Sequence, residues 1–204
     1  MLMWVVKLGG SLCEQAPETS PLRDWLDLLV REGAGRVVIV PGGGRFADAV
    51  RGAQAQWRFD DLTAHNMALL AMSQTAHLLR SLNPALRLCD REAALHQALR
   101  QGAVAVWSPL ELQRDRADAD TNWDVTSDSI ALGLALRLGA ARLIVVKSCE
   151  IDPSAALDQL SARGAVDRRF AMLAEGQSLR IDVVGQRTCS LMLGELKVRH
   201  DKGG

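Results

Sequence analysis

The chain has 204 residues and a mass of 22.1 kDa, with 24 basic and 24 acidic residues and a formal net charge of zero. At this length we expect one domain over residues 1–204, with a core that needs no metal or disulfide support. Balanced charge disfavours a nucleic-acid partner, because polyanion-binding proteins usually carry a basic excess. A hydrophobic content of 48% and a charged content of 24% exclude a disordered or collagen-like chain.

In chain order, apolar runs alternate with apolar residues at helical spacing. The pattern predicts a strand at 3–8, a helix at 21–33, a strand at 36–40, helices at 45–56 and 60–82, a strand at 86–89, a helix at 90–100, a strand at 103–107, a helix at 127–138, a strand at 143–146, helices at 154–163 and 168–175, and a strand at 179–184. Ser20 is expected to cap the first helix, with Pro21 at its first position. Residues 200–204 are expected to fray.

This alternation predicts the α/β fold class: a three-layer α/β/α sandwich with a mainly parallel central sheet. In such sheets, ligands bind outside the carboxyl ends of the strands. The glycine-rich segments of the chain follow predicted strands, so they should lie at that edge.

Cysteine usage and the N-terminus indicate a cytoplasmic protein without a membrane partner. The four cysteines are far apart and form no C-x-x-C pair, which disfavours a metal cluster or a disulfide scaffold. The apolar N-terminus is interrupted at Lys7, too early for a signal peptide. No stretch approaches the ~20 apolar residues of a membrane span.

Two glycine loops follow buried strands: Lys7-Leu-Gly9-Gly10-Ser11, and Gly42-Gly43-Gly44 before Arg45. Glycine lets several backbone N–H groups approach an oxyanion, and a following helix adds partial positive charge. The pair predicts two phosphate-sized anion sites that face each other, with Lys7 beside the first. Tight turns without a ligand are the alternative. Neither loop has the pattern of a P-loop or of a dinucleotide fingerprint.

The segment from Asp118 to Asn122 begins like a calcium loop, but Trp123 stands where the loop needs glycine and Ser129 where it needs glutamate. We therefore exclude calcium. Asp128 lies in the first turn of the next predicted helix. It is either an acid that complements the helix dipole or a carboxylate that orients Lys7 and a second cation around phosphates.

The four histidines have no zinc-ligand spacing, so we predict no metal held by protein side chains. His65 lies on the helix that follows the second glycine loop. It is either an ordinary core or surface histidine or a residue that faces the acceptor of a transferred group.

Three segments together resemble the amino acid kinase superfamily, which includes acetylglutamate, aspartate, uridylate, carbamate and isopentenyl phosphate kinases. They are Val5-Val-Lys-Leu-Gly-Gly-Ser11, Val38-Ile-Val-Pro-Gly-Gly-Gly44, and Asp124-Val-Thr-Ser-Asp128 with Leu143-Ile-Val-Val-Lys-Ser148. Two further segments, Trp123-Asp-Val-Thr-Ser-Asp-Ser129 and Ala64-His-Asn-Met-Ala-Leu-Leu-Ala-Met72, are similar to the branch that phosphorylates aminomethyl-furanmethanol phosphate in methanofuran biosynthesis and has relatives in bacteria that oxidise one-carbon compounds.

The resemblance implies roles for individual residues. Lys7 and Asp128 would be catalytic, Lys7 by bridging the transferring phosphoryl group and Asp128 by positioning lysines. The nucleotide phosphates would be held by Gly9, Gly10, Ser11, Lys147 and Ser148, although Lys147 could also be a solvated lysine at a strand end. The acceptor side would include Gly42, Gly43, Gly44 and His65, with Arg45 and Arg58 as candidate cations for an acceptor phosphate. This chain has Asp167 in the region where relatives carry a phosphate-contacting lysine. Arg168 or Arg169 would therefore have to contact the phosphate instead.

The predicted function is therefore transfer of a phosphoryl group from ATP, with Mg²⁺, to a small phosphate- or carboxylate-bearing acceptor. The resemblance also implies a homo-oligomer. One alternative is a non-catalytic, nucleotide-binding regulatory or storage subunit of the same fold. Another is a dehydrogenase on a doubly wound sheet, which the missing dinucleotide fingerprint makes the weakest of the three.

Overall fold

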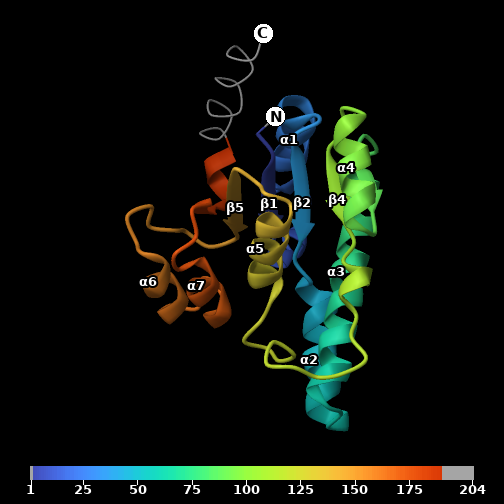
Figure 1. The fold of residues 1–204 in the computed structure, drawn as a ribbon, viewed down its shortest axis with the longest axis vertical. Helices are drawn as coiled ribbons and strands as arrows, with labels where there is room; N and C mark the ends of the chain where they lie inside the picture. Colours follow the sequence, from blue (N-terminus) through green and yellow to red (C-terminus); the bar gives the residue numbers. More distant parts are fainter. Residues whose placement is uncertain (1, 190–204) are drawn as a thin grey trace.

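A six-stranded parallel sheet organises the chain, in the strand order β3-β4-β2-β1-β5-β6 (Figure 1). The computed structural model describes residues 2–189, and the expected fraying of residues 200–204 lies outside this range. The strands are β1 (Trp4–Leu8), β2 (Val37–Pro41), β3 (Arg87–Cys89), β4 (Ala105–Trp107), β5 (Arg142–Lys147) and β6 (Arg180–Gly185).

Seven α-helices connect these strands within the described residues. They are α1 (Leu22–Gly33), α2 (Gly44–Trp57), α3 (Asp61–Leu82), α4 (Glu92–Arg100), α5 (Ser127–Arg137), α6 (Leu157–Ala162) and α7 (Arg168–Ala174). Short 3₁₀ turns lie at Gly10–Cys13, Leu110–Leu112 and Gln186–Thr188. The predicted α/β sandwich with a mainly parallel sheet is confirmed.

The central strands are buried on both faces, which is why β1, β2 and β5 read as almost continuous apolar runs. Val5 of β1 faces a core layer shared with α4 and α5, and Val6 faces the opposite layer with α1. Helix α3 contributes to both layers, through Leu69 to the first and Leu79 to the second.

Several helix starts differ by one to three residues from the prediction, and two of these differences have a clear cause in the structure. Helix α1 begins at Leu22, and Pro21 occupies the cap position instead of the first helical position. The Ser20 hydroxyl still accepts the Leu22 N–H at 3.2 Å, but it also donates to the Leu12 carbonyl. Its side chain therefore ties the helix start to the 3₁₀ turn after β1, a turn that the sequence did not predict.

The helix predicted at 154–163 is shorter, at Leu157–Ala162. The Asp152 carboxylate accepts both the N–H and the hydroxyl of Ser154, at 2.9 and 2.6 Å. This side-chain turn satisfies backbone groups locally, so the helix starts one turn later.

The strand register brings the functional segments to one edge of the sheet. Leu8 at the end of β1 pairs with Pro41 of β2 and with Val146 of β5, so the residues that follow leave the sheet at the same level. Figure 1 shows α2 and the first part of α3 extending beyond this edge, with the segment between β4 and α5 passing alongside α2.

Candidate active site

Two lysines share one buried aspartate at the carboxyl edge of the sheet. Lys7 Nζ lies 2.7 Å from Asp128 Oδ1, and Lys147 Nζ lies 2.8 Å from Asp128 Oδ2. Lys7 has the same parity along β1 as Val5, and Lys147 the same parity along β5 as Val145, so both point to the face that α5 covers. The sequence contains only four lysines, and half of them meet here.

Burial controls the charge states of this cluster. It lowers the pKa of Lys7, and the attraction of Asp128 opposes that effect while the nearby Lys147 adds to it. Burial alone would raise the pKa of Asp128, but the two lysines outweigh it and the net pKa is lowered. Two cations around one carboxylate leave a positive excess, which is the electrostatic environment that an anionic ligand requires.

The two glycine loops pack directly against each other. A Cβ atom on Gly10 would lie 2.0 Å from the backbone nitrogen of Gly44, and one on Gly42 would lie 2.3 Å from the nitrogen of Gly10. Gly44 also has a φ of +51°. These three positions therefore require glycine for the contact between the loops, whether or not a ligand is bound.

A cavity of about 340 Å³ opens beside the lysines. Of the predicted site residues, its walls include Lys7, Asp128, Lys147 and His65, together with Gly10, Ser11, Gly43 and Gly44. The structure thus brings together the donor-side and acceptor-side predictions in one space. A volume of this size suits a small molecule.

Several of the predicted residues do not line the cavity. Gly9 donates its N–H to the Val146 carbonyl at 3.1 Å and Gly42 donates to the Leu8 carbonyl at 2.8 Å, so both anchor the loops. The Ser148 and Ser11 hydroxyls lie 2.8 Å apart, which joins the end of β5 to the first loop. Arg45 is exposed and lies outside the cavity wall, as does Arg58 at the far end of α2.

Part of the cavity wall is apolar, with Ala68, Leu69 and Met72 from α3 and Ile130 from α5. Asp61 and His65 are polar residues that α3 adds to the wall; His65 is 9% exposed and its Nε2 atom has no hydrogen-bond partner. Burial and then the charge of Arg114 lower its pKa, which favours a neutral imidazole.

Arg51 and Trp123 form a second part of this wall that sequence reasoning missed. The Arg51 guanidinium lies 4.2 Å from the centre of the Trp123 ring, and Trp123 Nε1 donates to Gln54 Oε1 at 2.7 Å. These contacts dock the segment before α5 onto α2. The helical spacing of Gly44 and Arg51, two turns apart, places them on one face of α2 and was the available signal.

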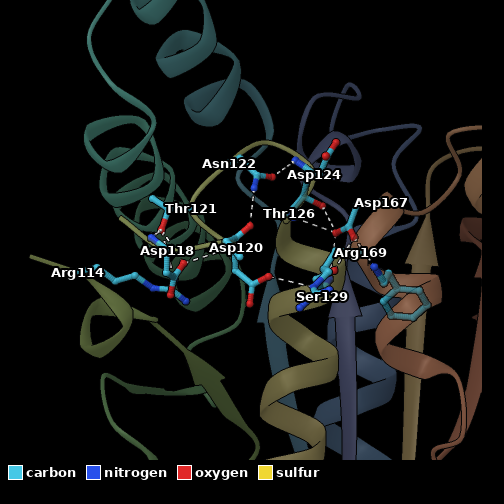
Figure 2. A network of polar contacts seen from close by, with 12 residues as sticks. Arg114, Asp118, Asp120, Thr121, Asn122, Asp124, Thr126, Ser129, Asp167 and Arg169 are labelled. Carbon is cyan, nitrogen blue, oxygen red and sulfur yellow. Dashed lines mark hydrogen bonds and ion pairs between the residues drawn. The ribbon is translucent and has the colours of Figure 1, made fainter. Parts of the chain in front are cut away.

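Asp167 is a further residue whose role the sequence did not indicate. Figure 2 shows its carboxylate between Thr126 and Ser129 at the start of α5, with Arg169 beside it. Arg169 pairs with Asp120 at 3.0 Å and does not line the cavity, and Arg168 is exposed. The structure therefore places neither arginine in the cavity wall, where a second phosphate-contacting cation was expected.

No cluster of three His, Cys, Asp or Glu side chains that could hold a metal ion occurs in residues 2–189. Both Asp128 oxygens are engaged by lysines. A magnesium ion that fits this donor set would be held mainly by phosphate oxygens, as is common for Mg²⁺ in phosphoryl-transfer sites. Over the same residues, no helix is long and apolar enough to cross a membrane.

Comparison with known sequences gives two matches. The family model of the amino acid kinase family matches residues 3–150. Over 211 residues the chain is 24% identical to the [5-(aminomethyl)furan-3-yl]methyl phosphate kinase of Methanocaldococcus jannaschii, covering 98% of this chain and 95% of that protein.

Solved structures share the fold over almost the whole chain. The uridylate kinase of Archaeoglobus fulgidus superposes with a TM-score of 0.69 at 18% identity, covering 97% of this chain and 96% of that one. The UMP kinase of Bacillus anthracis gives 0.67 at 18% identity, with 96% and 92% covered. An isopentenyl phosphate kinase gives 0.63 at 12% identity, with 95% and 96% covered.

Proposed function

The chain belongs to the amino acid kinase family and is a small-molecule kinase, and we propose that it transfers the γ-phosphoryl group of ATP to a small phosphate-bearing acceptor. We propose [5-(aminomethyl)furan-3-yl]methyl phosphate, the compound named for the Methanocaldococcus jannaschii relative, as the first acceptor to test. The product would be a diphosphate. A dehydrogenase is no longer a candidate, because the matching family and the neighbouring folds are those of kinases.

The observation that carries this proposal is the buried Lys7–Asp128–Lys147 cluster in the wall of a cavity beside two glycine loops. Phosphoryl transfer needs no enzyme nucleophile; it depends on in-line positioning and on neutralising charge on the transferring group. Lys7 is the cation for the transferring phosphoryl group, and Lys147 is the cation for the nucleotide phosphates. Asp128 keeps both ammonium groups at fixed positions.

Gly10 and Ser11 bind the donor side, and Gly43 and Gly44 bind the acceptor side, in each case through the backbone N–H groups that glycine leaves accessible. Mg²⁺ bound to the nucleotide would supply additional neutralisation of phosphate charge. Gly9, Gly42 and Ser148 support this arrangement by holding the loops rather than by contacting ligands.

The apolar part of the wall suits the furan ring of such an acceptor, and the carboxylates of Asp48 and Asp61 in the same wall suit its aminomethyl group, which is protonated at neutral pH. Arg45 and Arg58 lie outside the wall, so we replace them as acceptor-side cations by Arg51. Its guanidinium lies on α2, beyond the second glycine loop.

The test is release of ADP when the purified protein is given MgATP and one acceptor at a time. The panel is [5-(aminomethyl)furan-3-yl]methyl phosphate, UMP, isopentenyl phosphate and N-acetylglutamate. Phosphorus NMR should show a diphosphate product with the furan phosphate, and Lys7→Ala should slow its formation by roughly 10²–10³-fold. ATP binding without turnover on any acceptor would favour the non-catalytic alternative. Turnover on N-acetylglutamate alone would show that the acceptor bears a carboxylate and not a phosphate.

We further propose that the protein acts in the cytoplasm as a homo-oligomer. Its four cysteines are free, which suits a reducing compartment. Light scattering during size-exclusion chromatography would test the oligomer, and a mass of 22.1 kDa in solution would contradict it.

A further inference from the structure

One carboxylate holds the start of the helix that carries Asp128. Asp167 Oδ2 accepts the backbone N–H and the hydroxyl of Thr126, at 2.9 and 2.7 Å, and the N–H of Ser129 at 3.1 Å. Asp167 Oδ1 accepts the Ser129 hydroxyl at 2.5 Å and the Phe170 N–H at 2.7 Å. Five donors on one carboxylate fill its accepting capacity.

This arrangement replaces an ordinary helix cap. Thr126 is the N-cap residue of α5, but its side chain makes no cap hydrogen bond to the helix backbone. The Ser129 N–H, at the third position of the helix, is instead satisfied by Asp167 from 38 residues away. The same carboxylate caps α7 through Phe170, so the starts of α5 and α7 are joined at one point.

Asp128 lies between the two residues that Asp167 holds. Thr126 precedes it by two positions and Ser129 follows it directly, and both are fixed through backbone and side-chain groups. The orientation of the Asp128 carboxylate, and therefore of the two ammonium groups that it binds, depends on this fixed turn.

Asp167 also acts on the cluster through its charge. Three charged groups near Lys7 shift its pKa: Asp128, Lys147 and Asp167. Burial and Lys147 lower the pKa of Lys7, and the two aspartates oppose this. Loss of the Asp167 charge should therefore lower the pKa of Lys7 further.

We propose that Asp167 is a positioning residue for phosphoryl transfer, which holds the first turn of α5 so that Asp128 presents Lys7 and Lys147 to the reacting phosphates. The catalytic part of this inference rests on the proposed kinase function; the effect on Lys7 does not. Asp167 itself contacts no substrate in this scheme.

The experiment compares Asp167→Asn with Asp158→Asn, a control on the exposed surface of α6. With MgATP and [5-(aminomethyl)furan-3-yl]methyl phosphate, we expect kcat of Asp167→Asn to fall between roughly 10- and 100-fold while the KM values change much less, because small displacements of reacting groups cost rate rather than binding. Asp158→Asn should behave as wild type. A kcat for Asp167→Asn equal to that of wild type would overturn the proposal.

The second measurement does not depend on activity. With only four lysines in the chain, NMR of ¹³Cε-labelled lysine can follow the titration of Lys7, assigned with Lys7→Arg. We expect a lower Lys7 pKa in Asp167→Asn and an unchanged one in Asp158→Asn. If the wild-type protein transfers no phosphoryl group, the proposed function fails, but this titration still decides whether Asp167 affects Lys7. An unchanged Lys7 pKa in Asp167→Asn would contradict an electrostatic effect of Asp167 on Lys7.

Ser129→Ala and Thr126→Val cover the case in which Asp167→Asn does not fold. Each removes one hydroxyl contact and keeps the Asp167 charge. We expect both to lower kcat severalfold without moving the Lys7 pKa. Wild-type kcat in both variants would overturn the positioning role.

Discussion

The cavity is lined by two groups of charged side chains that differ in their exposure to solvent. At the sheet edge, the side chains of Lys7 and Asp128 are 4% and 3% exposed, and their attraction acts with little solvent screening. On α2, the side chains of Arg51 and Asp48 form an ion pair that is 46% and 62% exposed. Exposed pairs of this kind contribute little. This difference supports our proposal that the sheet edge supplies the electrostatic stabilisation of the reaction, whereas α2 and α3 select and place the acceptor.

The largest expected effect comes from Lys7→Ala at the sheet edge. Loss of a buried cation that faces the transferring group should lower kcat by roughly 10²–10³-fold, or about 2.7–4 kcal/mol. Coupled ADP release measures this, with Arg100→Ala on the exposed face of α4 as the control. A kcat within threefold of wild type would mean that the catalytic cation is elsewhere.

The contact between the loops should respond next. In Gly10→Ala the new methyl group would meet the Gly44 backbone, so the loops must separate, at a cost of about 1–3 kcal/mol in folding free energy. Gly52→Ala on α2 is the matched control, because nothing lies within 4 Å of its added Cβ, and it should stabilise the protein by about 0.5–1 kcal/mol. Urea unfolding measures both. Equal unfolding free energies for Gly10→Ala and Gly52→Ala would show that the two loops can separate at little energetic cost.

A smaller effect is expected on the acceptor side. Trp123→Leu removes the contact with Arg51 and the hydrogen bond to Gln54, and we expect the acceptor KM to rise about fivefold to tenfold while kcat changes little. Trp57→Leu is the control, because Trp57 is 74% exposed. A fall in kcat with an unchanged KM would place Trp123 with the sheet-edge group instead and would remove the distinction between the two groups.

The smallest effect concerns stability in acid. The lysines hold the pKa of Asp128 below its ordinary value of 3.8, against the effect of burial, so the unfolded chain binds the proton first as pH falls. The stability from this group is therefore present above about pH 4 and is lost as pH falls through the lowered pKa. Urea unfolding between pH 2.5 and 6 should give a shallower decline for Asp128→Asn than for wild type. Equal slopes would contradict the lowered pKa.

Much of the site could be predicted because its signals are local. Lys7, Asp128 and Lys147 stand at strand ends or at a helix start, and strand periodicity places both lysines on the face that α5 covers. Arg45, which follows the glycines directly, does not line the cavity, whereas Arg51, seven residues after Gly44 on α2, does.

By itself, the sequence determined the α/β class, the order of the elements and the two glycine loops, since each depends on residue periods of two or 3.6 and on short turns. Only the tertiary structure decided that Gly10, Gly42 and Gly44 are needed for the contact between the loops, and that Asp167 holds the turn around Asp128. Asp167 and Ser129 are 38 residues apart, and the lysines of the cluster are 140 apart. Contacts between such distant residues arise from the packing of strands and helices, and no local pattern in the chain specifies them.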